Sequence, residues 1–127
     1  MNRQAITTAG APAALGPYSQ AIVSGDLVFC AGQLGLDPVT AELADGVEAQ
    51  ADRALRNLAA VLDAAGCSFA DVVKTTIFLA DINDFAAVNA VYATFIVDPA
   101  PARSTFAVGS LPKGGRIEIE VIARRNG

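Results

Sequence analysis

The stretch DGVEAQADRALRNLAAVLDAAGCSFADVVKTTIFL, residues 45–79, decides the fold of this chain. Its first part repeats apolar side chains at the spacing of an amphipathic helix, namely Val47, Ala51, Leu55, Leu58 and Leu62. Asp45, with Glu48 three residues later, resembles a capping box and is expected to start this helix. Gly66 is expected to end it. The solvent side is expected to carry Arg53, Arg56, Asn57 and Asp63.

The end of the same stretch, residues 72–79, is rich in β-branched residues and predicts a strand. Upstream, Ile22-Val23 and residues 27–31 are typical of two strands joined in a tight hairpin at Gly25-Asp26. Strand 27–31, the helix and strand 72–79 together form a βαβ unit, which is right-handed by default.

A second helix is expected after Asp81 or Asn83, either of which can cap it. Asp98-Pro99 is expected to end this helix, because the residue before a proline avoids helical geometry. Its apolar positions are Phe85, Val88, Tyr92 and Phe95. Two further strands follow towards residue 127.

The order of elements predicts one α+β domain over residues 1–127, with a mixed sheet of about six strands and both helices on one face. The other face is left uncovered. Because a sheet that is apolar on both sides must hide its second face, another copy of the chain is the expected cover.

Composition excludes several classes of protein. Although 53% of the 127 residues are hydrophobic, no uninterrupted apolar stretch approaches the about 20 residues of a membrane helix, so no membrane partner is expected. Met1-Asn2-Arg3-Gln4 does not resemble the start of a signal peptide, and Cys30 and Cys67 are the two cysteines. We therefore expect a reduced, cytoplasmic protein without disulfides.

The chain contains no histidine, which removes the usual general base at neutral pH and most zinc sites. The net charge is −4 and the basic residues are scattered, which argues against nucleic acid as a partner. The glycines form neither a Walker loop nor a dinucleotide-binding motif. No metal and no organic cofactor is expected.

Two charged positions near the carboxyl end are candidates for chemistry. Arg103 starts an apolar, alternating segment after Pro101-Ala102. Its guanidinium is expected to bind a planar anion. The alternative is an intramolecular salt bridge. Glu118 and Glu120 share one face of the last strand, opposite Ile117, Ile119 and Val121. The alternative for this pair is a solvated strand edge.

Several short motifs occur in an order that is characteristic of a known family. They are Gly16-Pro17-Tyr18, Ala31-Gly32-Gln33, Val73-Lys74-Thr75-Thr76, Asn83-Asp84-Phe85 with Val88-Asn89, the run 101–106, and Arg116-Ile117-Glu118. From about residue 12 to Arg124 the chain resembles the Rid (YjgF-type) family of reactive-intermediate deaminases. The resemblance implies a chorismate-mutase-like fold and a homotrimer with active sites between subunits. It also implies hydrolysis of 2-aminoacrylate-type enamines and imines to 2-keto acids and ammonia.

The resemblance implies catalytic roles for three residues. Arg103 would bind the substrate carboxylate, and Glu118 would hold the attacking water and relay its proton. Tyr18, after the rigid Gly16-Pro17 turn, would offer its hydroxyl, although an aromatic residue at the start of a strand can equally be packing.

Four further positions are implied as substrate-binding residues. Gly32 would present its backbone N–H, and Asn89 matches a family landmark, although a strand-end turn and a bond to a loop carbonyl are their simpler roles. Thr105 stands where many relatives carry cysteine, and Ala31 where some carry serine or threonine. These two departures bear on substrate preference and rate.

The expected ligand is a small imino acid or its keto-acid product, and the expected protein partner is the chain itself. Three alternatives remain at this point. One is a regulatory trimer that binds carboxylates without turnover, and another is a family variant that acts on a different catabolic imine. The third is a ribonuclease or translation inhibitor, against which the acidic balance and the absence of histidine argue.

Overall fold

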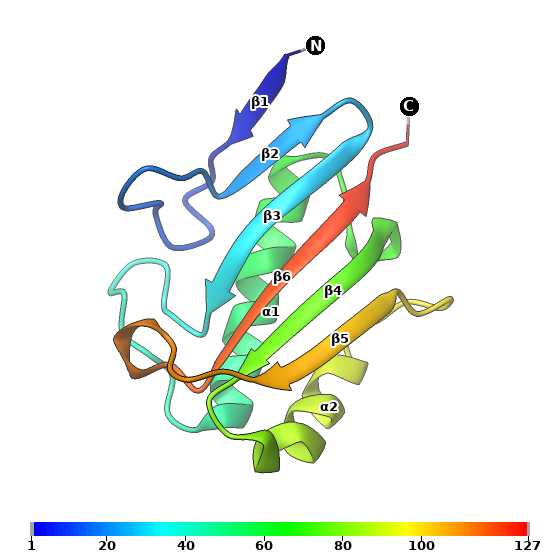
Figure 1. The fold of residues 1–127 in the computed structure, drawn as a ribbon. Helices are drawn as coiled ribbons and strands as arrows, with labels where there is room; N and C mark the ends of the chain where they lie inside the picture. Colours follow the sequence, from blue (N-terminus) through cyan, green and yellow to red (C-terminus); the bar gives the residue numbers. More distant parts are fainter. Residues whose placement is uncertain (1, 127) are drawn as a thin grey trace.

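The computed structural model describes residues 2–126, which form a six-stranded mixed sheet with two α-helices on one face (Figure 1). The strands are β1 (Arg3–Ile6), β2 (Ala21–Ser24), β3 (Leu27–Leu34), β4 (Val72–Leu79), β5 (Ala102–Ala107) and β6 (Ile117–Arg124). The helices are α1 (Val47–Ala64) and α2 (Phe85–Ala93). Within residues 2–126, neither helix combines the length and apolar character that a membrane crossing requires.

The strand order is β1-β2-β3-β6-β4-β5. Strand β6 is antiparallel to both β3 and β4, so these two are parallel to one another with β6 inserted between them. The predicted βαβ unit is therefore present as a split unit, joined by α1. Helix α2 joins β4 to its parallel neighbour β5, and both crossing helices lie behind the sheet in Figure 1, as predicted.

The amino-terminal half contains one predicted and one unpredicted pairing. Strands β2 and β3 form the expected antiparallel hairpin around Gly25-Asp26, where Gly25 has a φ of 63°. Strand β1 adds to the outer edge of β2. Three of its four residues are exposed, so it lacks the apolar alternation by which a strand is recognised in a sequence.

Two predicted helix starts need correction. Helix α1 begins after Gly46, which makes no side-chain capping hydrogen bond, so the capping box of Asp45 and Glu48 is wrong. The end at Gly66 is confirmed, because Gly66 takes the left-handed conformation with a φ of 80°. Asp81 does cap, but it caps the short 3-10 turn Ile82–Asp84 that leads into α2.

The end of α2 also differs from the prediction. The helix stops at Ala93, before Asp98-Pro99 is reached. The Thr94 hydroxyl donates to the Val91 carbonyl at 2.7 Å, and the Thr94 N–H donates to the same carbonyl at 3.1 Å. The last turn therefore tightens to 3-10 spacing, which takes up carbonyl groups that a continuing helix would use.

The core lies between α1 and the helix-facing side of the sheet. The predicted apolar stripe of α1 is confirmed, and several core side chains are completely buried: Leu55, Leu58 and Leu62 from α1, Ile77 from β4, and Ile117 and Ile119 from β6. Burial of each large aliphatic side chain contributes about 1.5–3 kcal/mol. This layer fixes which face of β4 and β6 points to the helices.

Asn57 is an exception to the predicted solvent face of α1, because it is completely buried. Its Nδ2 donates to the carbonyls of Leu34 at 3.2 Å and Leu36 at 2.9 Å, and its Oδ1 accepts from Arg53 Nε at 3.1 Å. The amide thus satisfies backbone groups where the chain leaves β3. Asn57 therefore fixes the path of the chain at the end of that strand.

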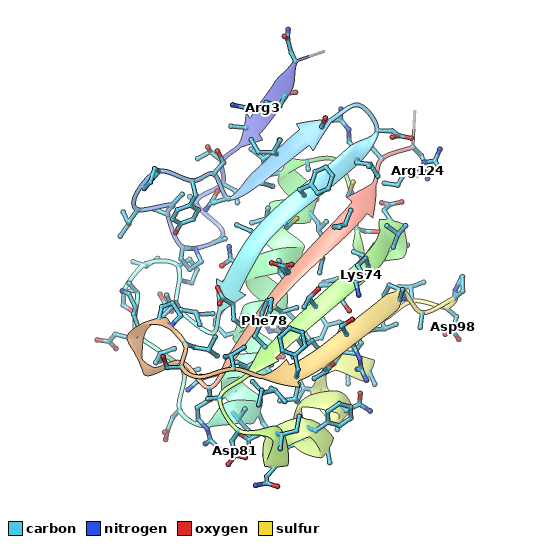
Figure 2. All side chains as sticks on the ribbon, in the orientation of Figure 1. Arg3, Lys74, Phe78, Asp81, Asp98 and Arg124 are labelled. Atoms are coloured by element: carbon cyan, nitrogen blue, oxygen red, sulfur yellow. The ribbon has the colours of Figure 1, made fainter. Side chains whose placement is uncertain are left out.

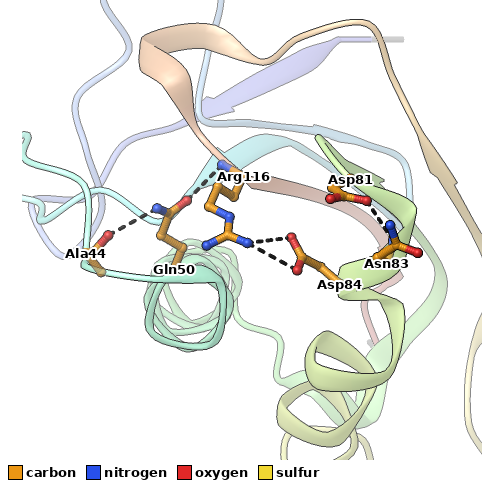
Figure 3. Close-up of polar contacts among 6 residues, drawn as sticks. All are labelled: Ala44, Gln50, Asp81, Asn83, Asp84 and Arg116. Carbon is orange, nitrogen blue, oxygen red and sulfur yellow. Dashed lines mark hydrogen bonds and ion pairs between the residues drawn. The ribbon is translucent and has the colours of Figure 1, made fainter.

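Gln50 makes a comparable link from the first turns of α1 (Figure 3). It is buried, and its Nε2 donates to the Ala44 carbonyl at 3.1 Å while its Oε1 accepts from the Arg116 backbone N–H at 2.8 Å. Arg116 Nη2 donates to both carboxylate oxygens of Asp84, at 3.0 and 3.1 Å. These contacts hold the start of β6 against α1 and against the turn before α2.

The second face of the sheet is left open by α1 and α2. Lys74 and Phe78 project from β4 on this open face, towards the viewer in Figure 2. Phe106 lies edge-on to Phe78, with 5.3 Å between the ring centroids, and is 45% exposed. Phe29, on β3, is 42% exposed. A partly apolar open face of this kind was predicted from the element order.

We expect Asn57→Ala to lower the free energy of unfolding by about 2–3 kcal/mol, because it leaves two buried carbonyls unpaired and opens a small cavity. Arg56→Ala is the matched control, since the neighbouring Arg56–Asp52 ion pair is exposed and such pairs contribute about 0–1 kcal/mol. Urea unfolding of both variants measures the difference. Equal losses would contradict the assigned role of Asn57.

Candidate active site

Strand β6 sorts its side chains strictly by face. Ile117, Ile119 and Val121 point to the helices and are 0–2% exposed. Glu118 and Glu120 point to the open face, where Glu118 is half-buried and Glu120 is exposed. The predicted shared face of the two glutamates is therefore confirmed, and their environments differ.

Glu118 forms part of a pocket of about 670 Å³ on the open face. The walls come from the loop before β2, from the end of β3, and from the turn before β6. Four of the predicted site residues line this pocket: Tyr18, Ala31, Gly32 and Glu118. Residues far apart in the sequence are thus brought together here.

Gly32 allows the carboxylate of Glu118 to lie against the backbone of β3. A Cβ atom at Gly32 would come within 2.6 Å of Glu118 Oε2, which is closer than atoms pack. The pairing of β3 with β6 shifts in register between Cys30 and Gln33, so Gly32 lies in a bulge. Close approach of side chain to backbone explains the glycine at this position better than turn geometry does.

The pKa of the Glu118 carboxyl is raised above its ordinary value. Desolvation by burial is the larger cause, and the negative charge of Glu120 is the smaller one. A carboxylate whose pKa is raised is a better proton acceptor than a solvated one. Glu118 is therefore suited to general acid–base chemistry.

The loop that carries Tyr18 is fastened by Gln20, which is buried. Gln20 Oε1 accepts from the Thr8 N–H at 2.7 Å, and its Nε2 donates to the Pro12 carbonyl at 2.8 Å. Tyr18 itself is 56% exposed at the rim of the pocket. Its ring is therefore not core packing within this chain.

Arg103 lies on the other side of the sheet. Its Cα partner on β4 is Thr75, which in turn pairs with Val121 on β6, and all three belong to the helix-facing side. Glu118 belongs to the open face. A single chain therefore does not bring Arg103 and Glu118 to the same pocket.

Three side chains of α2 surround the Arg103 guanidinium. Nη1 donates to Asn89 Oδ1 at 2.6 Å, and Cζ lies 5.5 Å from the ring centroid of Phe85 and 5.0 Å from that of Tyr92. Residues 85, 89 and 92 share one face of a helix, because they are four and three positions apart. The sequence pattern marked Phe85 and Tyr92 as core positions, so their contact with Arg103 was missed.

The Arg103 guanidinium has no carboxylate within 4.0 Å among residues 2–126. Ion pairs there join other residues, namely Arg56–Asp52, Arg116–Asp84 and Arg124–Asp26. Within residues 2–126, Arg103 thus does not form the intramolecular salt bridge that was the alternative. Arg103 lies on β5, at the edge of the sheet, where its free N–H donors can meet an anion.

Thr105 lies on the same side of β5 as Arg103, two residues further on. Its Oγ1 is buried and has no hydrogen-bond partner within the described part of the chain. Buried hydroxyl groups are normally paired, so an unpaired one calls for an explanation. Arg103, Asn89 and Thr105 form a second group of predicted site residues, separate from the Glu118 pocket.

The described residues offer little else that could catalyse a reaction. Within residues 2–126, no three His, Cys, Asp or Glu side chains are grouped to hold a metal ion. Cys30 and Cys67 are buried free thiols, and burial, with a smaller effect of Cys67, raises the pKa of Cys30 to about 12. Such a thiol is not ionised at neutral pH and is a poor nucleophile.

The chain has close counterparts among known proteins. Residues 8–125 match the protein family described as Endoribonuclease L-PSP. The chain is 52% identical over 122 residues to the 2-iminobutanoate/2-iminopropanoate deaminase of Capra hircus, covering 95% of this chain and 89% of that protein.

Two solved structures are also close. The structure of RidA from the Antarctic bacterium Psychrobacter sp. PAMC 21119 superposes with a TM-score of 0.93 at 48% identity, covering 95% of this chain and 98% of that one. Escherichia coli TdcF with bound serine gives a TM-score of 0.92 at 41% identity, covering 97% and 99%. Since a family match over most of the length and several close relatives agree with the motifs and the fold, the chain belongs to the Rid/YjgF family, whose family description is Endoribonuclease L-PSP.

Proposed function

We propose that this protein is a hydrolase that deaminates small 2-imino acids, of the 2-aminoacrylate type, to 2-keto acids and ammonia. The observation that carries the proposal is a guanidinium without a carboxylate partner in residues 2–126, together with a pocket carboxyl whose pKa is raised. The first can bind an α-carboxylate and the second can activate water. The deaminase name of a relative at 52% identity supports the same activity.

We propose further that the active site is completed between subunits of a chorismate-mutase-like homotrimer. Arg103 and Glu118 lie on opposite sides of the sheet, so one small molecule cannot contact both within a single chain. A second copy that docks on the open face would bring its own edge strand β5, which carries Arg103, to the Glu118 pocket. Contacts of this head-to-tail kind close into a ring.

The first step of the mechanism is binding of the substrate carboxylate. The Arg103 fork makes two parallel hydrogen bonds to it. Asn89 holds the guanidinium by accepting from Nη1 at 2.6 Å. The unpaired Thr105 hydroxyl supplies a further hydrogen bond to the ligand. Because Thr105 stands in place of a cysteine, this bond is made by a hydroxyl rather than a thiol, and this bears on which imino acid is preferred.

The second step is attack of water on the imine carbon. Glu118 orients the water and accepts one of its protons as the C–O bond forms, which gives a tetrahedral carbinolamine. Glu118 passes that proton to the nitrogen, which completes the carbinolamine. It then carries the proton of the new hydroxyl group to the nitrogen as the C–N bond breaks and the C=O bond forms, and ammonia and the keto acid are released. Tyr18 and the N–H of Gly32 hydrogen-bond the substrate in the pocket, which Ala31 also lines. One water is consumed for each ammonia released.

The alternatives make different predictions. The TdcF structure has serine bound, a small molecule with an α-carboxylate, which favours a small-molecule ligand for this chain too. The family description names an endoribonuclease, but a net charge of −4 does not favour RNA. A regulatory binder would bind keto acids without ammonia release.

Cytoplasmic location is part of the proposal, since Cys30 and Cys67 are free thiols.

We expect Arg103→Ala to abolish ammonia release from 2-iminobutanoate that an amino-acid oxidase generates in the assay, while the protein stays folded. Arg103→Lys should restore less than about one tenth of the activity, because an ammonium does not reproduce the bidentate fork. Circular dichroism and sedimentation serve as controls for folding and assembly. Near-wild-type turnover by a folded Arg103→Ala protein would refute the proposal.

Glu118→Gln should lower kcat/KM by about 10²-fold or more, the usual contribution of a positioned acid–base group. Glu120→Gln is the matched control on the same face of β6, and it should change turnover only slightly because Glu120 is exposed. Equal effects of the two substitutions, or a larger effect of Glu120→Gln, would show that water activation is assigned to the wrong residue.

The raised pKa of Glu118 also predicts an effect on stability. Because its pKa is higher in the folded state, ionisation of Glu118 opposes folding, and stability is lost as the pH rises through the folded-state pKa. Glu118→Gln should therefore be more stable than the wild type at pH 7. The gain should vanish as the pH falls below the ordinary value of 4.5. Urea unfolding at both pH values measures this, and a loss of stability at pH 7 would contradict the assigned cause.

Gly32→Ala should reduce kcat/KM by about 10-fold or more, because the added methyl group displaces the Glu118 carboxylate from its working position. Its stability should change little, since the displaced group is the end of a flexible side chain. Ala31→Gly, one residue away, serves as the comparison in the same assay. Unchanged turnover in Gly32→Ala would argue that the contact between Gly32 and Glu118 is unimportant.

A further inference from the structure

Tyr92 connects Arg103 to the interior of the protein. Its ring centroid lies 5.0 Å from Arg103 Cζ, and its hydroxyl lies 2.8 Å from Thr75 Oγ1. Tyr92 is 6% exposed and Thr75 is completely buried, so water does not compete for this hydrogen bond. One side chain therefore contacts both the half-buried cation and the core.

The sheet places the two contacts of Tyr92 side by side. Thr75 on β4 and Arg103 on β5 are direct partners in the parallel pairing, so both side chains point to α2 from the same level. Tyr92, on α2, contacts both residues of this pair. Phe85 and Asn89 also contact Arg103, but both are exposed at the surface of α2. Of these three α2 residues, Tyr92 is the one that the core holds in place.

Ordinary core packing does not account for this arrangement. Packing requires an apolar ring at position 92, but it requires neither the Tyr92 hydroxyl nor the Thr75 hydroxyl. A phenylalanine above a valine would fill almost the same space without two buried polar groups, and such replacement of both partners is close to neutral for stability. The hydrogen bond fixes the position of the ring along β4, and the ring faces the guanidinium.

We propose that Tyr92 is a positioning residue for Arg103, fixed in place by Thr75, so that the guanidinium fork is held ready for the substrate carboxylate. This inference rests on the proposed function, because it assigns Arg103 the carboxylate. A cation over an aromatic ring is attracted to its face. A long side chain that is already ordered loses less conformational freedom when the ligand binds. Tyr92 therefore acts on ligand affinity, through Arg103.

The test compares Tyr92→Phe, Thr75→Val and the double variant Thr75→Val/Tyr92→Phe. Each single substitution leaves one buried hydroxyl unpaired and should lower the unfolding midpoint, whereas the double variant should return close to the wild-type midpoint. All three should raise KM for 2-iminobutanoate and the Kd of its product 2-oxobutanoate by about 3- to 10-fold, with kcat within about twofold. Calorimetry gives the Kd without any need for turnover.

The double variant separates positioning from a merely structural role. If the pair only supports the fold, affinity will return together with stability in the double variant, and that result would overturn the inference. Val88→Ala is the matched control on α2, since Val88 is buried in the core and is not one of the hydrogen-bond or cation–π partners given for the guanidinium. It should lower the midpoint and leave the Kd unchanged; a Kd that rises in Val88→Ala as it does in Tyr92→Phe would also overturn the inference.

Failure of the inference can be told from failure of the proposed function. Suppose that the wild type releases ammonia and that Arg103→Ala is inactive, while the Tyr92 and Thr75 variants keep wild-type affinity. That result would overturn the inference alone. A wild-type protein with neither turnover nor binding of 2-oxobutanoate would remove the proposed function and this inference together.

Discussion

The constraint on which the rest of the structure depends is the alternation of side chains across a sheet that α1 and α2 cover on one face. Ile117, Ile119 and Val121 must face the helices, so Glu118 must face the open side. The same rule turns Arg103 towards α2, because it pairs with the buried Thr75. The two charged groups that the proposed chemistry uses are thereby separated within each chain, and the proposed trimer would bring them together.

The two groups are also electrostatically complementary. Arg103 carries a charge that no carboxylate of residues 2–126 neutralises. Glu118 sits where burial and the charge of Glu120 disfavour its ionised form. In the proposed reaction, the substrate carboxylate pairs with the first group and the reacting water lies at the second. Hydrogen bonds of buried side chains lie near each group: Gln50 bonds to Arg116 before β6, and Tyr92 on α2 bonds to Thr75 on β4.

Most of the architecture could be predicted from the sequence, because it depends on periodicity. The stripe of α1, the β2–β3 hairpin and the two faces of β6 all follow from local patterns. Contacts that depend on tertiary structure could not be predicted. Asn57 lies among charged residues of α1, and only the path of the chain after β3 explains its burial. Strand β1 has no apolar pattern of its own and forms by pairing with β2.

The site residues were predicted from motifs, but their grouping was not. Sequence motifs give positions along the chain, whereas the sheet register decides which positions share a face. The register places Tyr18, Gly32 and Glu118 in one pocket and Arg103 with Asn89 in another environment. Tyr92 fitted the apolar stripe of α2, so its polar contact with Thr75 had no signal in the sequence.

The most direct test of the account is complementation between two inactive variants. Arg103→Ala and Glu118→Gln chains with different tags are co-expressed, and assemblies that contain both are purified. If each site combines Arg103 of one chain with Glu118 of its neighbour, every mixed trimer contains one intact pair, and activity should return to about one third of the wild-type value. Mixed assemblies with no more activity than the two parent variants would contradict the account.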